Sequence, residues 1–459
     1  MFRAETYISR RSRLKKTIGS GLILLPGNDE SPMNYADNLY PFRQDSSFLY
    51  FFGLDQPSLA GVIDADSGEE IIFGDELTID DIVWMGAQPT LAERSGLVGI
   101  SKTSPLSDLR AVVDEAARQG RKIHFLPPYR PENKIALSTL LGLDPAVAHD
   151  GASIDLIKAV VGQRNYKSAE EIAEIEKAVN TTVDMHLAAM TMARPGMVEA
   201  RIAAKVHEVA LAAGGNLSFP VIATVHGETL HNHYHGHILE RGQMFLLDAG
   251  AETAMHYAGD MSSTFPVDTT FTDRQKEIYQ IALDSHLAAV DMLAPGVTFE
   301  EVHFAASKTI AAGLKSMGLM KGNVDDAVEQ GAHALFFPCG TGHMIGLDVH
   351  DMEDLGEVHV GYDGKPKSTL FGLKSLRLAR TLEPGFVHTI EPGIYFIPDL
   401  IDLWRGEGRF KDFIDYDRVD GYRDFGGIRN EEVYAITERG ACLLGIPLPK
   451  TIDEVEAVR

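Results

Sequence analysis

Short apolar runs alternate with helix-like stretches over the first third of the chain. Runs at 21–25, 60–63 and 70–73 have the length of buried strands, and residues 109–118 repeat apolar positions at helical spacing. Strands and helices that alternate in this way are typical of an α/β domain. The pattern therefore predicts an N-terminal α/β domain over residues 1–160.

Residues 40–53 form the aromatic-rich centre of this domain, with the sequence Tyr-Pro-Phe-Arg-Gln-Asp-Ser-Ser-Phe-Leu-Tyr-Phe-Phe-Gly. On periodicity alone, such a tract is either core or an interface. The pattern changes after residue 160. Ser168-Ala169-Glu170-Glu171 resembles a capping box, in which a serine and a glutamate three residues later satisfy the first amides of a helix. We expect a long helix from there to about Met192, in a second domain that spans residues 161–459.

The second domain repeats its own pattern. The tract His186–Gly196 has a counterpart in His286–Gly296, and each ends in a Pro-Gly turn between two helical patterns. A Leu-Glu-x-Gly turn, five residues, an acid, one residue and a glycine also occur twice, with Asp248 and Glu391 as the acids. The repeats predict two α+β halves that are related by a pseudo-twofold axis and present acids to a shared centre.

Two acids of the first half follow strand-like segments. The apolar run 244–247 ends in Asp248, and Asp260 lies twelve positions later in another β-prone segment. Each acid taken alone can be an ordinary turn residue, since Asp-Ala-Gly and Gly-Asp are common in turns. Carboxylates on neighbouring strand ends, however, repel each other unless a cation lies between them.

Composition limits the classes of function. The 459 residues carry a formal charge of −24, with 44% hydrophobic and 24% charged residues, so a broad phosphate-binding face for nucleic acid is not expected. The two cysteines, Cys339 and Cys442, cannot form a disulfide framework or a zinc–cysteine site. The N-terminus has early charges and no apolar signal segment, and no run is long enough to cross a bilayer. We expect a cytoplasmic protein without a membrane span.

Further candidates lie downstream of the two aspartates. His343 follows a glycine-rich bend, and Asp248, Asp260, His343, Glu391 and Glu431 together form a set of four carboxylates and one imidazole. Such a set suits two divalent ions, and its oxygen-rich character favours Mn²⁺, with Co²⁺, Zn²⁺ and Fe²⁺ as alternatives. Paired ions activate water and polarise a carbonyl group, as amide hydrolysis requires. Upstream, residues 231–237 place four histidines on one side if this segment is extended.

The motifs resemble those of the pita-bread metallopeptidases, the family of methionine aminopeptidase, prolidase and aminopeptidase P. Leu-Asp-Ala-Gly, Tyr-Ala-Gly-Asp-x-x-x-Thr-Phe-Pro, Gly-His-x-x-Gly-Leu-Asp-Val-His-Asp, Ile-Glu-Pro-Gly-Ile-Tyr and Gly-Ile-Arg-x-Glu occur in the order of the family. The aromatic tract at 40–53 is similar to the creatinase-type N-domain of members that cleave Xaa-Pro bonds. The resemblance implies a pita-bread catalytic domain behind an N-terminal α/β creatinase-like domain.

The resemblance also implies a role for each candidate. It assigns the five ligands named above to the metals, with Asp260 and Glu431 bridging and Glu391 also moving a proton. It makes His350 and His231 residues that contact the substrate, although His233 or His235 could have this role in place of His231. It makes Arg429 the residue that braces an acid of the site. His237 and His256 are then surface or structural residues, and Cys339 is a small buried thiol instead of a nucleophile.

The resemblance implies a Xaa-Pro aminopeptidase, which removes the residue before a proline from a peptide. The alternative is a prolidase, which accepts only dipeptides and must recognise a free carboxylate. A remote alternative is a binding member of the fold without catalysis, which loss of a ligand would mark; all five ligands are present. Family members also suggest a homo-oligomer, either a dimer or a tetramer. The segments 352–382 and 399–424 are longer than in compact members, and their roles stay open.

Overall fold

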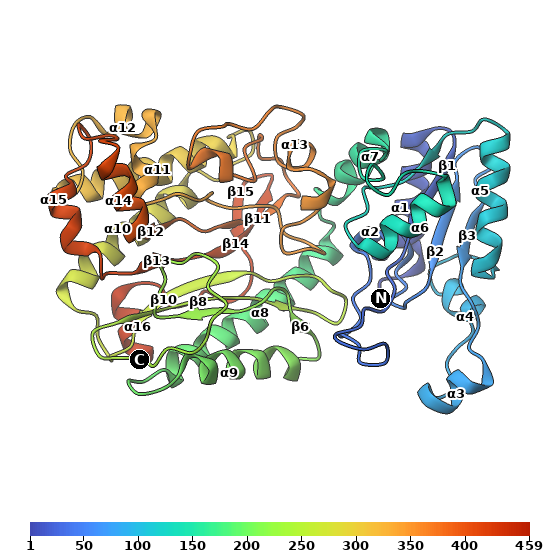
Figure 1. Cartoon of the computed structure of the whole chain (residues 1–459), viewed down its shortest axis with the longest axis horizontal. Helices are drawn as coiled ribbons and strands as arrows, with labels where there is room; N and C mark the ends of the chain where they lie inside the picture. Colours follow the sequence, from blue (N-terminus) through green and yellow to red (C-terminus); the bar gives the residue numbers. More distant parts are fainter. The chain divides into compact units, whose positions relative to one another are not determined.

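A computed structural model describes all residues from 1 to 459. The chain divides into two compact units (Figure 1). The N-terminal unit comprises Met1–Arg164 and Asp354–Gly356, and the C-terminal unit comprises Asn165–Glu353 and Glu357–Arg459. No helix of the structure has both the length and the apolar character that crossing a membrane would need.

The N-terminal unit is built on a five-stranded mixed sheet of order β4-β3-β2-β1-β5. β1 pairs antiparallel with β2 and parallel with β5, while β3 pairs antiparallel with β2 and parallel with β4. The strands are β1 (Leu22–Pro26), β2 (Ala60–Asp64), β3 (Glu70–Phe73), β4 (Lys102–Ser104) and β5 (Ile123–His124). The three apolar runs that predicted strands therefore form the middle of this sheet, and the α/β interpretation is confirmed.

Helices pack against this sheet. The helices of the unit are α1 (Ala4–Ile18), α2 (Ser46–Phe52), α3 (Ile79–Met85), α4 (Leu91–Gly96), α5 (Leu109–Arg118), α6 (Pro131–Leu141) and α7 (Ile154–Arg164). Alternate residues of the strands, such as Leu22 and Leu24, form one core cluster with Val113 of α5 and Leu137 of α6. Every residue of α2 is buried, so most of the aromatic tract is core, whereas Tyr40 is exposed.

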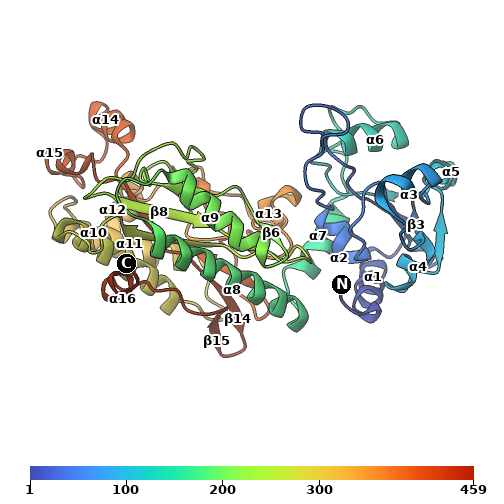
Figure 2. The same cartoon turned by 90° about the horizontal axis from the view of Figure 1, so that it is seen from below.

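The first half of the C-terminal unit consists of two long helices and a small sheet. Ser168 caps α8 as predicted, and its side chain accepts from the Glu171 amide in a capping box. The elements are α8 (Ala169–Met192), α9 (Glu199–Ala212), β6 (Asn216–Leu217), β7 (Ile222–Thr224), β8 (Met244–Ala249), β9 (Ala251–Glu252) and β10 (Met261–Pro266). The strands form a β10-β8-β7 sheet and a β6-β9 ribbon, and α8 and α9 pack side by side (Figures 1 and 2).

The second half repeats this plan with more insertions. Its main elements are α10 (Asp273–Asp291), α11 (Phe299–Ser316), α12 (Val324–Gln330), α13 (Glu357–Val360), β11 (Val387–Ile390), β12 (Gly393–Tyr395), α14 (Pro398–Gly406), α15 (Tyr416–Val419), β13 (Gly427–Arg429), β14 (Glu432–Thr437), β15 (Gly440–Leu443) and α16 (Ile452–Val458). Helices α10 and α11 pack together as α8 and α9 do. The strands form a β11-β14-β15 sheet and a β12-β13 ribbon. The duplicated α+β halves are confirmed.

The histidine-rich tract at 231–237 differs from the expectation. The segment is an irregular loop and not an extended strand. The Nε2 atom of His235 lies 3.1 Å from the Val221 carbonyl, and the Nδ1 atom of His237 lies 2.9 Å from the Glu199 carboxylate. Because the segment is not a strand, the condition under which all four histidines would lie on one side is not met. His256 pairs with Glu252 at 2.9 Å.

Gly259 lets the segment that leads into β10 approach α8 closely. A Cβ atom at Gly259 would lie 2.7 Å from the Thr182 hydroxyl and 2.9 Å from the Ala178 carbonyl oxygen. Because these contacts involve helix backbone, relief of the clash requires α8 and the segment with Gly259 to separate. The residue that follows is Asp260, so this contact also sets the position of that acid.

We predict that Gly259→Ala destabilises the protein by about 1–3 kcal/mol, because overpacking a filled interior forces the backbone to shift. The urea midpoint of unfolding measures the change. Gly406→Ala is the matched control, since Gly406 ends α14 with no atom within 4 Å of the added Cβ, and it should be neutral or slightly stabilising. Equal midpoints for both variants would contradict the close-contact argument.

Candidate active site

Two aspartates reach the centre of the C-terminal unit from one hairpin. Asp248 is the fifth residue of β8, and Asp260 directly precedes β10. The two strands pair antiparallel, with Asp248 opposite Ser262. Asp260 and Ser262 are two residues apart and share a face of an extended chain, which places all three side chains at the same end of the sheet.

Two glutamates reach the same place from the second half. Glu391 directly follows β11, and Glu431 directly precedes β14. These strands pair antiparallel with Ile390 opposite Glu432, so the two glutamates continue the same register beyond the strands. The acids of the two halves therefore occupy corresponding positions of the repeat.

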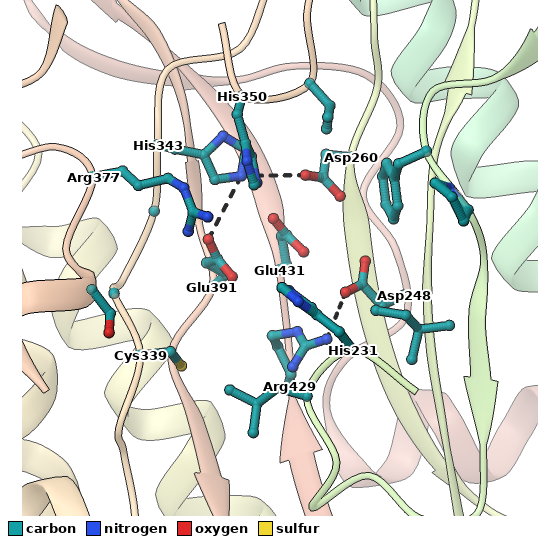
Figure 3. A pocket seen from close by; sticks show the side chains of 18 of the residues that line it. His231, Asp248, Asp260, Cys339, His343, His350, Arg377, Glu391, Arg429 and Glu431 are labelled. Atoms are coloured by element: carbon teal, nitrogen blue, oxygen red, sulfur yellow. Dashed lines mark hydrogen bonds and ion pairs between the residues drawn. The ribbon is translucent and has the colours of Figure 1, made fainter. Parts of the chain in front are cut away.

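All eight candidate residues line one cavity of about 240 Å³ in the C-terminal unit (Figure 3). They are His231, Asp248, Asp260, His343, His350, Glu391, Arg429 and Glu431. Phe219, Pro220, Ile222, Leu230 and Val349 add an apolar wall. Such a mixture of apolar surface and converging polar groups is typical of a small-molecule or peptide site.

The tightest group is formed by Asp260, His343 and Glu431, whose potential ligand atoms all lie within 4.8 Å of one another. The Nε2 atom of His343 lies 3.3 Å from Asp260 and 3.6 Å from Glu391. The Nδ1 atom of His343 faces the Met344 carbonyl at 3.1 Å, which leaves Nε2 toward the acids. This arrangement is the usual one for a histidine that ligates a metal through one nitrogen.

Two carboxylate oxygens in this group are buried without a hydrogen-bond donor, Oδ1 of Asp260 and Oε1 of Glu431. Buried polar atoms are nearly always satisfied, so an unpartnered pair calls for an explanation. Burial, and then the proximity of the other acids, raises the pKa of both carboxyl groups well above the ordinary range. Burial likewise raises the pKa of Glu391 to about 7. The donor set and the unpartnered oxygens fit divalent cations.

Arg429 holds the edge of the cluster together. Its guanidinium donates to Asp248 at 2.5 Å, to the Tyr395 hydroxyl at 2.8 Å and to the Ser262 hydroxyl at 3.0 Å. Ser262 in turn donates to Glu431 at 2.8 Å. This network leaves Arg429 with acceptors on three sides and fixes one oxygen each of Asp248 and Glu431.

Two histidines stand at the cavity wall. His350 packs edge-on against His343 with ring centres 4.3 Å apart, and its Nδ1 lies 2.5 Å from Glu353. Its Nε2 is therefore the nitrogen that can contact a ligand. His231 is exposed on the wall formed by the loop after β7, and Figure 3 shows it beside Arg429 and Asp248. Its rival His233 lines the cavity too, whereas His235 does not.

The chain matches the model of metallopeptidase family M24 over residues 173–438. Residues 7–124 match the N-terminal domain of aminopeptidase P. The chain belongs to metallopeptidase family M24. The resemblance on the motifs is thereby confirmed, as is the pita-bread catalytic domain behind a creatinase-like N-domain.

Proteins similar to this M24 chain are named either as Xaa-Pro aminopeptidases or as Xaa-Pro dipeptidases. Xaa-Pro aminopeptidase of Escherichia coli (strain K12) is 30% identical, with 92% of this chain and 90% of the relative covered. Xaa-Pro dipeptidase of Homo sapiens is 29% identical, with 98% and 91% covered. The solved structure of aminopeptidase P from E. coli with the inhibitor Pro-Leu has a TM-score of 0.80 and 28% identity, and the match covers 100% of this chain and 98% of that one.

Four residues in or beside the site were not among the candidates that the sequence predicted. Ser262 and Tyr395 bind Arg429, and their positions two and four residues after the acids Asp260 and Glu391 could have revealed them. Arg377 lines the cavity, and Glu353 holds both His350 and Arg377, at 2.5 and 3.4 Å. Both lie in the segment 352–382, which has short 3₁₀ and helical turns and no periodicity that would point to a site.

Cys339 of the M24 chain lines the cavity as a half-buried thiol. Burial, and then the nearby Glu391 carboxylate, raises the pKa of this thiol to about 12. Because only the thiolate is nucleophilic, Cys339 is inert at neutral pH. This agrees with the prediction of a structural thiol, and Cys442 is the exposed cysteine of the chain.

We expect iodoacetamide at pH 8 to alkylate Cys442 at least about a hundredfold faster than Cys339, since a pKa of about 12 leaves almost no thiolate. Peptide mass spectrometry over time gives both rates in one sample. Unfolding in urea serves as the control and should make the two rates similar. Comparable rates in the folded protein would show that the thiol environment is described wrongly.

Proposed function

We propose that this protein is a Xaa-Pro aminopeptidase, which hydrolyses the bond between an N-terminal residue and a following proline in a peptide. The observation that carries the proposal is the buried group of Asp260, His343 and Glu431 with Asp248 and Glu391 beside it in a cavity. The names and coverage of the relatives support the Xaa-Pro specificity.

In this proposal, two divalent cations would be held by five residues of the cavity, Asp248, Asp260, His343, Glu391 and Glu431. The oxygen-rich set favours Mn²⁺, and Co²⁺, Zn²⁺ and Fe²⁺ are alternatives. One solved relative is a zinc-substituted E. coli aminopeptidase P in complex with product. Such ions, when bound, make a water nucleophilic near neutral pH and polarise the carbonyl of the scissile bond.

The side chains of this chain supply orientation and proton movement. Glu391 lies 3.6 Å from His343 and lines the cavity, so its carboxylate is placed to take a proton from the attacking water and return it to the leaving nitrogen. His350 offers Nε2, and His231 its imidazole, to the oxygen and nitrogen atoms of the substrate backbone. Arg429 holds Asp248 in place through an ion pair of 2.5 Å.

A dedicated site for such bonds has a physical reason. The nitrogen of a proline amide carries no hydrogen, so enzymes that bind the scissile N–H cannot hold it in the usual way. The apolar wall of Phe219, Pro220, Ile222 and Leu230 offers a surface for the pyrrolidine ring. The substrate class proposed is therefore a peptide with proline in the second position.

Arg377 favours a second candidate, a Xaa-Pro dipeptidase. Its guanidinium lines the cavity with about a third of the side chain exposed, and its partners Glu353 and Glu357 lie at 3.4 and 3.6 Å from Nε. The remaining nitrogens of this side chain can bind the free carboxylate of a dipeptide. A longer peptide has no carboxylate at that position. The two candidates therefore differ in what Arg377 contacts.

For the first candidate, the manganese-loaded protein should release free amino acid from Xaa-Pro-Xaa tripeptides, and Arg377→Met should change KM for them by less than about threefold. For the second, only Xaa-Pro dipeptides are cleaved, and Arg377→Met should raise KM at least about tenfold, since a charge-assisted hydrogen bond contributes about 1.5–3 kcal/mol. Lys374→Met, which removes an exposed cation beyond the cavity, is the control. Hydrolysis of neither peptide by the metal-loaded protein would reject both candidates.

The metal assignment has its own test. Asp260→Asn and Glu431→Gln should each keep the circular dichroism of the parent but lower bound metal and reduce peptide hydrolysis by at least about a hundredfold, because a buried carboxylate ligand is lost. Metal content after gel filtration and initial rates measure the two effects. Asp284→Asn on the exposed face of α10 is the control. Near-normal turnover in either acid variant would overturn the two-metal assignment.

The assembly and the place of action are further parts of the proposal. We propose a homo-oligomer, a dimer or a tetramer, in the cytoplasm. Helix α3 supports self-association, because Ile79, Val83, Trp84 and Met85 are 74%, 73%, 86% and 54% exposed and none of its residues is buried. We also keep the division into domains 1–160 and 161–459 as a proposal.

A further inference from the structure

Two buried histidines outside the cavity occupy corresponding positions in the two halves. His186 lies in α8 and His286 in α10, the two helices that begin the halves (Figure 1), and both side chains are fully buried. They open the repeated tracts that end in Pro-Gly. Neither lines the cavity, and the proposed reaction uses neither of them.

His186 makes hydrogen bonds to both strands of the hairpin that carries the two aspartates. Its Nε2 lies 3.2 Å from the carbonyl oxygen of Ala249, the residue after Asp248, and its Nδ1 lies 2.7 Å from the hydroxyl of Ser263 on β10. A carbonyl can only accept, so the Nε2 of His186 donates and its Nδ1 accepts from the hydroxyl. One ring therefore ties β8 to β10 beside their acids.

His286 makes hydrogen bonds to the residues on either side of Glu431 in the other half. Its Nδ1 lies 3.2 Å from the carbonyl oxygen of Asn430, the residue before Glu431, and its Nε2 lies 3.1 Å from the carboxylate of Glu432. Both partners can only accept, so Nδ1 donates to the carbonyl beside the acid and Nε2 donates to the Glu432 carboxylate. The two halves thus use opposite ring nitrogens to hold the backbone next to a cluster acid.

We propose that His186 and His286 are a duplicated pair of positioning residues that fix the acid-bearing strand ends for metal binding. The inference rests on the proposed two-metal function. The acids of the cluster repel one another, and each strand end would relax outward if it were held only by its own sheet. A hydrogen bond to the residue next to an acid opposes this outward movement directly beside the acid. Loss of the bond should therefore weaken metal binding before it affects the rest of the fold.

The different nitrogens give a test that a general packing role would not satisfy. The amide nitrogen of glutamine can replace Nε2 of histidine, and that of asparagine can replace Nδ1. We expect His186→Gln and His286→Asn to bind Co²⁺ within about threefold of the parent. The swapped variants, His186→Asn and His286→Gln, should bind about tenfold more weakly, as is usual when a residue that orients metal ligands is lost. Calorimetry and the Co²⁺ absorption spectrum measure binding without reference to turnover.

His333 provides the matched control. It is also fully buried, and neither ring nitrogen has a hydrogen-bond partner. His333→Gln and His333→Asn should leave Co²⁺ affinity unchanged, whatever they do to the melting temperature. Ring ¹⁵N NMR of the parent adds a measurement that needs no variant: a proton should reside on Nε2 of His186 and on Nδ1 of His286.

The outcomes separate this inference from the proposed function. A parent protein that binds no Co²⁺ overturns the two-metal function and the inference with it. The inference alone is overturned if the parent binds Co²⁺ but the same substitution weakens binding at both positions, whether this is asparagine at 186 and 286 or glutamine at 186 and 286. Equal weakening by the His333 variants, or the absence of a proton on Nε2 of His186 or on Nδ1 of His286, also overturns the inference alone.

Discussion

The crowding of four carboxylates in a buried site is the constraint on which the C-terminal unit depends. Burial raises the pKa of Asp260 and of Glu431, and each also feels the charges of its neighbours. Charges in such a place are tolerated only when counter-charges or donors compensate them. The fold provides part of this compensation through Arg429 and Ser262 and leaves two oxygens free for cations.

The surrounding structure can be understood as a frame that resists this repulsion. Gly259 permits α8 to lie directly against the segment that precedes Asp260. On the other side, the loop after His343 is tied down by a buried ion pair of Lys167 and Asp351 at 2.8 Å. A glycine contact and an ion pair differ in chemistry, yet both fix backbone close to a functional side chain. Separate local contacts near the functional side chains therefore hold the backbone of the site in place.

Local signals explain why much of this architecture was predictable. The strand at 244–249 and the helix at 169–192 follow from apolar runs and from a capping box, which are properties of neighbouring residues. The acids at strand ends followed from the internal repeat. Arg377 could not be predicted, because its position depends on a long segment without periodicity. The course of the histidine tract could not be predicted either, because His237 and His235 contact Glu199 and the Val221 carbonyl, which the residues of the tract themselves do not indicate.

The duplicated halves have the form of a symmetric dimer joined into one chain. In a true symmetric dimer every side chain occurs twice, so both sides of a shared centre must be chemically identical. Joining the halves removes that restriction. Here Asp248 faces the guanidinium of Arg429, whereas Asp260 faces the imidazole of His343. Each acid of the shared centre can therefore have a neighbour of its own, one a permanently charged guanidinium and the other an imidazole.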